Sequence, residues 1–101
     1  MRDVNNPMFE FSQQGPNHIS SSTGHSIEIL GRAGLRVDLG DATIEIDSEM
    51  LNTPMSIAMY PASIPEATPT PAPDILHEVI KGLEWAGFGV EVIGVVRSGR
   101  A

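Results

Sequence analysis

The chain has 101 residues, of which 41% are hydrophobic and none is cysteine, and its formal net charge is −7. This length suits one domain, the lack of cysteine excludes disulfides and thiolate chemistry, and no segment approaches the ~18–20 apolar residues of a membrane helix. Because no such segment is present, we expect no membrane as partner. Residues 25–96 contain eleven of the acidic residues and only three of the basic ones, a balance of −8 that repels phosphate backbones, so we expect no nucleic acid as partner.

Residues 1–25 are rich in Asn, Gln, Ser, Gly and Pro and show no sustained hydrophobic period. This composition predicts a flexible polar arm ahead of a single domain at residues 26–96, followed by a tail at residues 97–101. Phe9 and Phe11 could anchor a short piece of the arm to the domain. The start of the chain lacks the basic region and apolar run of a secretory signal, so the expected location is the cytoplasm.

After the arm, the hydrophobic pattern changes to period two, which is typical of strands with one buried face. Residues 26–29 form the first such run, and residues 35–39 and 42–47 form two more on either side of Gly40-Asp41. A two-residue loop with Gly at its first position predicts a hairpin with a primed turn and a fixed register. In that register Leu39, Val37 and Leu35 face Ala42, Ile44 and Ile46, while Arg36 and Asp38 face Glu45 and Thr43.

The second half of the chain predicts one strand, a connector, one helix and a closing strand. Residues 55–60 read as a strand, and the five prolines of residues 61–73 predict a semi-rigid surface connector. An apolar stripe at helical spacing begins near Pro73-Asp74 and ends before Gly87. Residues 90–96 are largely apolar on both faces and predict an interior strand, which we expect to pair antiparallel because so few residues separate it from the helix.

Together these elements predict an α+β fold. It should consist of a mostly antiparallel sheet of about five strands with one helix, in the C-terminal half, packed on one face of the sheet.

No residue set in the chain has the spacing of a catalytic or metal site. His18, His25 and His77 are not accompanied by a second ligand at metal-binding spacing, and we expect them to be exposed to solvent. The serines at residues 20–22 are not surrounded by a Gly-x-Ser-x-Gly elbow. We therefore predict a non-enzymatic protein without a metal or a cofactor.

Carboxylates recur on the predicted outward face of the first strands. A general acid–base pair would need one carboxyl group with a pKa raised by apolar burial, whereas these positions alternate regularly toward solvent. Arg36 is expected to pair with Glu45 across the hairpin. Two interpretations stay open, a solvated face that keeps the domain soluble and a face that docks a basic patch of a partner. The candidate partner-binding residues are Glu28, Asp38, Glu45 and Asp47.

Trp85 is the only tryptophan and lies away from the apolar stripe of the predicted helix. On a helical wheel it falls on the opposite side, together with Asp74, Glu78 and Lys81. Either the Pro-rich connector or the N-terminal arm covers its ring, or the ring is exposed. An exposed tryptophan among acidic residues would be a candidate interface anchor.

The middle of the chain resembles a known family. The segment TIEIDSEML at residues 43–51, the segment IAMY at residues 57–60, and the pair Ser63-Ile64 are similar to the immunity protein 74 family of bacterial polymorphic-toxin and contact-dependent inhibition systems. The resemblance spans about residues 26–96. This chain has Pro65-Glu66 and a long Pro-rich insertion where family members often have Trp-Glu.

The resemblance implies a cytoplasmic antidote that binds and neutralises a cognate toxin domain and has no enzymatic activity. Many such toxins are nucleases with basic clefts, so an acidic antidote would cover a basic surface. It also makes Glu49 a candidate toxin contact, although from the residues alone Glu49 could instead accept hydrogen bonds from backbone N–H groups of the following turn. The alternative is a structural or adaptor domain that self-associates through a sheet edge, which makes a homo-oligomer possible.

Overall fold

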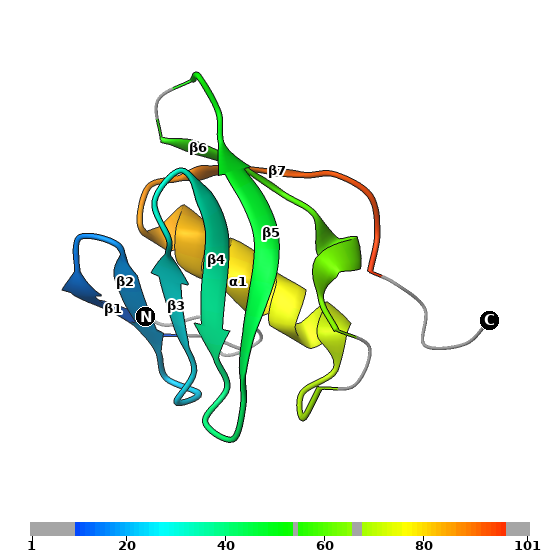
Figure 1. The fold of residues 1–101 in the computed structure, drawn as a ribbon. Coiled ribbons are helices and arrows are strands. Elements are labelled where there is room, and N and C mark those ends of the chain that lie inside the picture. The colour runs from blue at the N-terminus through cyan, green and yellow to red at the C-terminus, as the bar shows by residue number, and fades with distance from the viewer. Residues whose placement is uncertain (1–9, 54, 66–67, 97–101) are drawn as a thin grey trace, which may run out of the picture.

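The computed structural model describes residues 10–53, 55–65 and 68–96, and these form an α+β fold with seven strands and one α-helix (Figure 1). The strands lie in the sheet in chain order, and every neighbouring pair is antiparallel except β6 and β7, which are parallel. The elements are β1 Phe11–Gly15, β2 His18–Ser21, β3 Ser26–Ile29, β4 Ala33–Asp38, β5 Thr43–Met50, β6 Ser56–Met59, the 3-10 helix η1 Pro61–Ser63, α1 Ala72–Trp85 and β7 Gly89–Val92.

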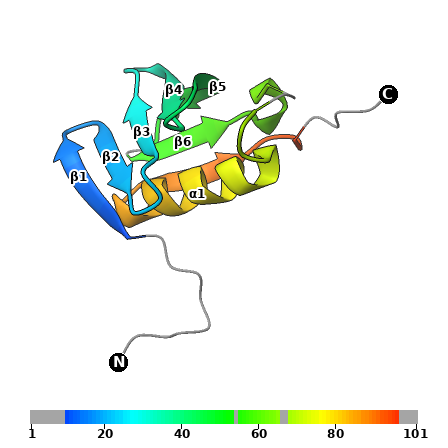
Figure 2. The same cartoon turned by 90° about the horizontal axis from the view of Figure 1, so that it is seen from below.

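The sheet curls, and α1 lies along its concave side (Figure 2). The core fills the space between the two layers, since the apolar side chains that alternate along β2–β6 meet the buried stripe of the helix there. The convex side of the sheet is called the outer face below. It carries the strand residues that alternate with the buried apolar ones. The α+β class is therefore confirmed, but the sheet has seven strands rather than about five and is mixed.

The predicted hairpin is confirmed as β4 and β5. Leu35 pairs with Ile46, Val37 with Ile44, Arg36 with Glu45 and Asp38 with Thr43, and the Leu39 N–H donates to the Ala42 carbonyl at 2.7 Å. Gly40 has φ +89°, the left-handed conformation that the first position of a primed turn needs. Because the loop has only two residues, it allows one register, and that register buries every apolar side chain of the hairpin between Leu35 and Ile46 except Ala42, which is partly exposed.

The prediction of a flexible arm at residues 1–25 is wrong for its second part. Residues 11–15 and 18–21 form β1 and β2, which extend the sheet antiparallel to β3, while residues 1–9 lie outside the described part of the chain. These strands sit at the edge of the sheet, so their outward side chains are polar. Ile19 is their only fully buried apolar residue, which is why no period two was visible.

The helix begins and ends close to the predicted positions. Its C-terminus is a Schellman motif, in which the Gly87 N–H donates to Glu84 and the Phe88 N–H to Leu83, with φ +102° at Gly87. Gly82 lets the helix approach the sheet closely, because a Cβ there would lie 2.8 Å from the Ile27 Cδ1 atom.

The closing strand differs from the prediction in both neighbour and burial. β7 pairs parallel to β6, because the connector and α1 together return the chain to the start of β6 and form a βαβ unit. Its other side is paired with no strand of the described residues, so β7 is an open edge rather than an interior strand. Val92 and Ile93 are accordingly exposed.

The Pro-rich connector is only partly a surface segment. Pro61 and Ile64 are buried and join the connector to the core beside β5, whereas residues 66–67 lie outside the described part. The predicted tail at residues 97–101 also lies outside it.

Candidate functional site

A row of charges crosses the outer face of β3, β4 and β5. Glu28, Arg36 and Glu45 are direct cross-strand neighbours, and the Arg36 guanidinium lies 3.3 Å from a Glu28 oxygen and 3.8 Å from a Glu45 oxygen. The predicted pairing of Arg36 with Glu45 is therefore confirmed, with Glu28 as the nearer partner. One arginine thus offsets two of the candidate carboxylates, through exposed contacts worth ~0–1 kcal/mol each.

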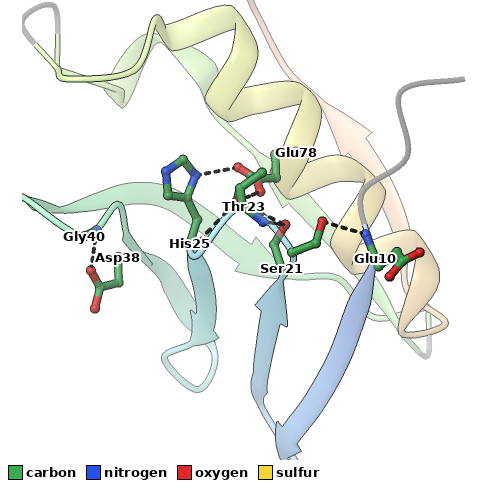
Figure 3. Close-up of polar contacts among 8 residues, drawn as sticks. Glu10, Ser21, Thr23, His25, Asp38, Gly40 and Glu78 are labelled. Atoms are coloured by element: carbon green, nitrogen blue, oxygen red, sulfur yellow. Dashed lines mark hydrogen bonds and ion pairs between the residues drawn. The ribbon is translucent and has the colours of Figure 1, made fainter.

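Asp38 lies on the same face but also stabilises its own turn. Its Oδ1 atom accepts the Gly40 N–H at 2.9 Å, as in an Asx turn (Figure 3). One carboxylate oxygen of Asp38 is therefore engaged in the fold, although the side chain is exposed.

Asp47 and Glu49 lie further along β5, where the pairing with β4 is irregular. The register shifts between Ala33 and Leu35, and the Gly34 N–H donates to the buried Ser48 hydroxyl at 3.0 Å. Ser48 therefore points inward while its two acidic neighbours point outward. The Asp47 N–H donates to the Ser63 hydroxyl at 2.8 Å, which fixes the backbone here.

These two carboxylates border an open hollow of about 480 Å³ on the outer face. No described residue forms a hydrogen bond or ion pair with either carboxylate, so the expected hydrogen bonds from backbone N–H groups of the following turn to Glu49 are not found. The hollow combines two acidic residues with one aromatic residue, a combination suited to a basic side chain. It is lined by Ala33, Gly34, Asp47, Ser48, Glu49 and Tyr60.

Glu91 extends this acidic surface to the edge of the sheet. Glu49 pairs with Ala58, and Ala58 pairs with Glu91, so the two glutamates lie on one rung of the outer face with a small residue between them. Glu91 and Tyr60 were not among the site residues predicted from the sequence. The parallel pairing of β7 with β6 brings Glu91 to the outer face near Glu49, and no local sequence pattern predicts that pairing.

Trp85 is not part of this surface. It lies on α1, in the layer that covers the opposite side of the sheet, and it is 49% exposed. The ring of Phe11 lies against it with a centroid distance of 6.0 Å and an interplanar angle of 41°. Of the predicted alternatives, the exposed ring is therefore the one observed, with Phe11 of the N-terminal segment in contact with it.

Glu78 was expected beside Trp85 on the exposed side of the helix, and that expectation is wrong. It is only 4% exposed and accepts hydrogen bonds from Thr23 at 2.5 Å and from His25 Nδ1 at 2.7 Å (Figure 3). His25 is correspondingly not solvent-exposed, with 17% of its side chain accessible. Burial by itself would raise the pKa of Glu78, but hydrogen bonds from Ser21, Thr23 and His25 and the charge of His25 outweigh it and lower this pKa.

The buried Glu78 cluster joins the turn between β2 and β3 to the middle of the helix. Its members come from a turn and a helix that are far apart in the sequence, and every polar side-chain atom buried within the described residues has a partner. A fully satisfied cluster of this kind fixes the position of a helix relative to a sheet. We interpret it as part of the fold.

The outer face thus brings together five of the six predicted partner-binding residues and leaves Trp85 apart. Within the described residues, no three His, Asp or Glu side chains are placed to hold a metal ion. The described helix is not long and apolar enough to cross a membrane.

In comparisons with known proteins, no protein-family model, no curated protein and no solved structure matches this chain.

Proposed function

We propose that the protein is a cytoplasmic, non-enzymatic immunity protein that binds a bacterial toxin domain and neutralises it by covering a basic surface. The observation that carries the proposal is the pair of exposed residues Asp47 and Glu49 on the outer face of the sheet, which have no ionic partner among the described residues and border a hollow with Tyr60. The choice of a toxin as the partner rests on the resemblance of residues 43–64 to the immunity family.

The physical basis of the proposal is electrostatic. A net charge of −7 steers a cationic partner toward the chain. Within the outer face, Arg36 already lies against Glu28 and Glu45, whereas Asp47 and Glu49 have no ion pair among the described residues. A lysine or arginine that docks at the hollow would lie beside the two acidic residues Asp47 and Glu49 and beside Tyr60.

The test is co-expression in a bacterial host with the toxin domain encoded beside this gene. The wild-type chain should restore growth and form a complex on a sizing column. The double variant Asp47→Lys, Glu49→Lys should weaken the complex by at least about tenfold, with the loss concentrated at low salt. Asp74→Lys with Glu84→Lys is the matched control, since it makes the same change of net charge at exposed positions of the helix.

Killing that is unimpaired by the wild-type chain, with no complex on the column, would refute the proposal. If the control variant lost as much affinity as the Asp47/Glu49 variant, the partner would respond to net charge alone and the assigned surface would be wrong.

A structural or adaptor domain that self-associates through a sheet edge is the second candidate. The observation that favours it is the open edge of β7, where Val92 and Ile93 are 41% and 42% exposed. Sedimentation of the purified chain distinguishes the two functions. A tight homo-oligomer that forms without a toxin would favour self-association, and a monomer would count against it.

A further inference from the structure

The two edges of the sheet differ in how well they are protected against pairing with another strand. Natural sheets protect their edges with charges, prolines or bulges. The β1 edge carries Ser12, Gln13 and Gln14 and an irregular register between Gln13 and Gly15. The β7 edge has neither a proline nor an irregular register within its described residues, and its one charged residue is Glu91.

The hydrogen bonds of β7 show which of its backbone groups point away from the sheet. The Gly89 N–H donates to Met55 at 2.7 Å and the Ile93 N–H donates to Met59 at 2.8 Å. Because alternate residues of a strand direct their N–H and C=O groups to opposite sides, those of Val90 and Val92 point toward the open edge. These N–H and C=O groups can therefore donate hydrogen bonds to one further strand and accept hydrogen bonds from it.

The side chains of β7 indicate the chemistry of that further strand. Val90 and Val92 pair with Ile57 and Met59 and so share the apolar side of the sheet, while Glu91 lies on the outer face. A strand added here would thus meet apolar side chains on one side and the carboxylate of Glu91 on the other. A segment in which valine-like residues alternate with lysine or arginine matches both sides.

A second copy of this chain matches the edge less well. In an antiparallel pair of two β7 strands, Val90 of one copy pairs with Val92 of the other, because the backbone groups of these residues point outward. This register places Glu91 directly opposite the Glu91 of the second copy. Like charges at that position are destabilising, and each copy also brings a net charge of −7. Registers that separate the two glutamates shorten the pairing, since Gly94 has φ +88° and leaves the strand conformation.

We propose that β7 is a docking edge for an extended, basic–apolar strand of a partner protein, added to the sheet through the backbone groups of Val90 and Val92. This binding mode is β-augmentation, in which backbone hydrogen bonds give affinity and alternate side chains give specificity. The inference holds whether or not the partner is a toxin, because it concerns a different surface from the hollow beside Asp47.

The test uses a seven-residue peptide of alternating valine and lysine, acetylated and amidated, added to the full chain at millimolar concentration. Amide hydrogen exchange measured by NMR should slow at Val90 and Val92 by at least about tenfold, because these amides gain a hydrogen-bond partner. A peptide of alternating valine and glutamate should leave them unchanged.

Two variants connect the effect to the edge. Val92→Pro removes only an N–H that points outward, so the chain should stay folded and the peptide should no longer bind. Ile93→Pro is the contrasting change, since it removes the N–H bonded to Met59 and should lower the melting temperature. Glu91→Lys leaves the backbone unchanged and should reverse the preference between the two peptides, so that the valine–glutamate peptide binds and the valine–lysine peptide does not.

Three results would overturn the inference. One is unchanged exchange at Val90 and Val92 with millimolar valine–lysine peptide. Another is binding of the valine–lysine peptide that is equally tight for the wild type, for Val92→Pro and for Glu91→Lys. The third is a homodimer of the free protein in sedimentation that Val92→Pro converts to monomer, because a second copy would then occupy the edge. None of these results depends on toxin neutralisation, so the two proposals fail separately.

Discussion

Replacing Glu78 by glutamine tests whether the buried cluster holds the helix on the sheet. The carboxylate of Glu78 accepts hydrogen bonds from Thr23 and His25, and hydrogen bonds to a charged group contribute roughly 1.5–3 kcal/mol each. Glutamine keeps one acceptor oxygen but turns an N–H₂ group toward a donor. Because Thr23 is exposed and 17% of His25 is accessible, water can replace part of what is lost, so we expect the lower end, about 2 kcal/mol.

In a domain of this size, a loss of about 2 kcal/mol lowers the melting temperature by roughly 8–16 °C. Urea unfolding at pH 7 should show the same loss as a lower midpoint with an unchanged slope. Glu84→Gln is the matched control, because it makes the same change of charge at an exposed position of the same helix, and it should stay within about 0.5 kcal/mol of wild type.

The difference between wild type and Glu78→Gln should depend on pH in one direction. The folded state lowers the pKa of Glu78 from its ordinary value of 4.5, so the ionised carboxylate stabilises the fold above that value. This contribution is complete at pH 7 and is lost as the pH falls through the lowered pKa. Equal stability of the two proteins at pH 7 would refute the reasoning, because it would mean that desolvation of the carboxylate cancels its hydrogen bonds.

Two further predictions concern the C-terminal end of the helix and the contact between the Phe11 and Trp85 rings. Gly87→Ala should lower the stability by about 1–2 kcal/mol, because Gly87 has φ +102° in the Schellman motif; an unchanged urea midpoint would show that the helix can end in another way. Phe11→Ala should shift the Trp85 fluorescence to longer wavelength and increase its quenching by iodide, because the Phe11 ring covers part of Trp85; an unchanged spectrum would contradict the contact.

The parts of the fold that the sequence predicted are those in which a local rule decides the structure. The β4–β5 hairpin follows from a two-residue loop and strict alternation, so its register was predictable residue by residue. The ends of α1 follow from Gly87 and from the prolines before Asp74. β1 and β2 obey no such rule, because strands at the edge of a sheet need only one buried side chain such as Ile19. The direction of β7 depends on the length of chain before the helix, which local periodicity does not measure.

The candidate site shows the same division. Alternation along β3–β5 correctly placed Glu28, Asp38, Glu45 and Asp47 on one face, because side-chain direction in a strand is local. The position of Glu91 beside them depends on the pairing of β5, β6 and β7, which joins distant segments. Glu78 was predictable in principle, since it falls at helical spacing between Ile75 and Gly82 on the buried stripe. It was misplaced because its charge was assumed to require solvent, whereas Thr23 and His25 of the β2–β3 turn donate hydrogen bonds in place of water.

The carboxylates of the outer face differ in whether they have a partner, and those without one lie on one side of this face. Glu28 and Glu45 share Arg36, and Asp38 accepts the N–H of its own turn. Asp47, Glu49 and Glu91 have no ion pair among the described residues, and they lie toward the β5–β7 side of the sheet. The unpartnered charge therefore lies next to the one edge where backbone groups and apolar side chains are also open. If charge serves only solubility, it can be spread over any surface, whereas binding of a basic strand requires charge, apolar contact and unpaired backbone at one place. The outer face and the β7 edge meet this requirement together, which is why we assign partner binding to this side of the molecule.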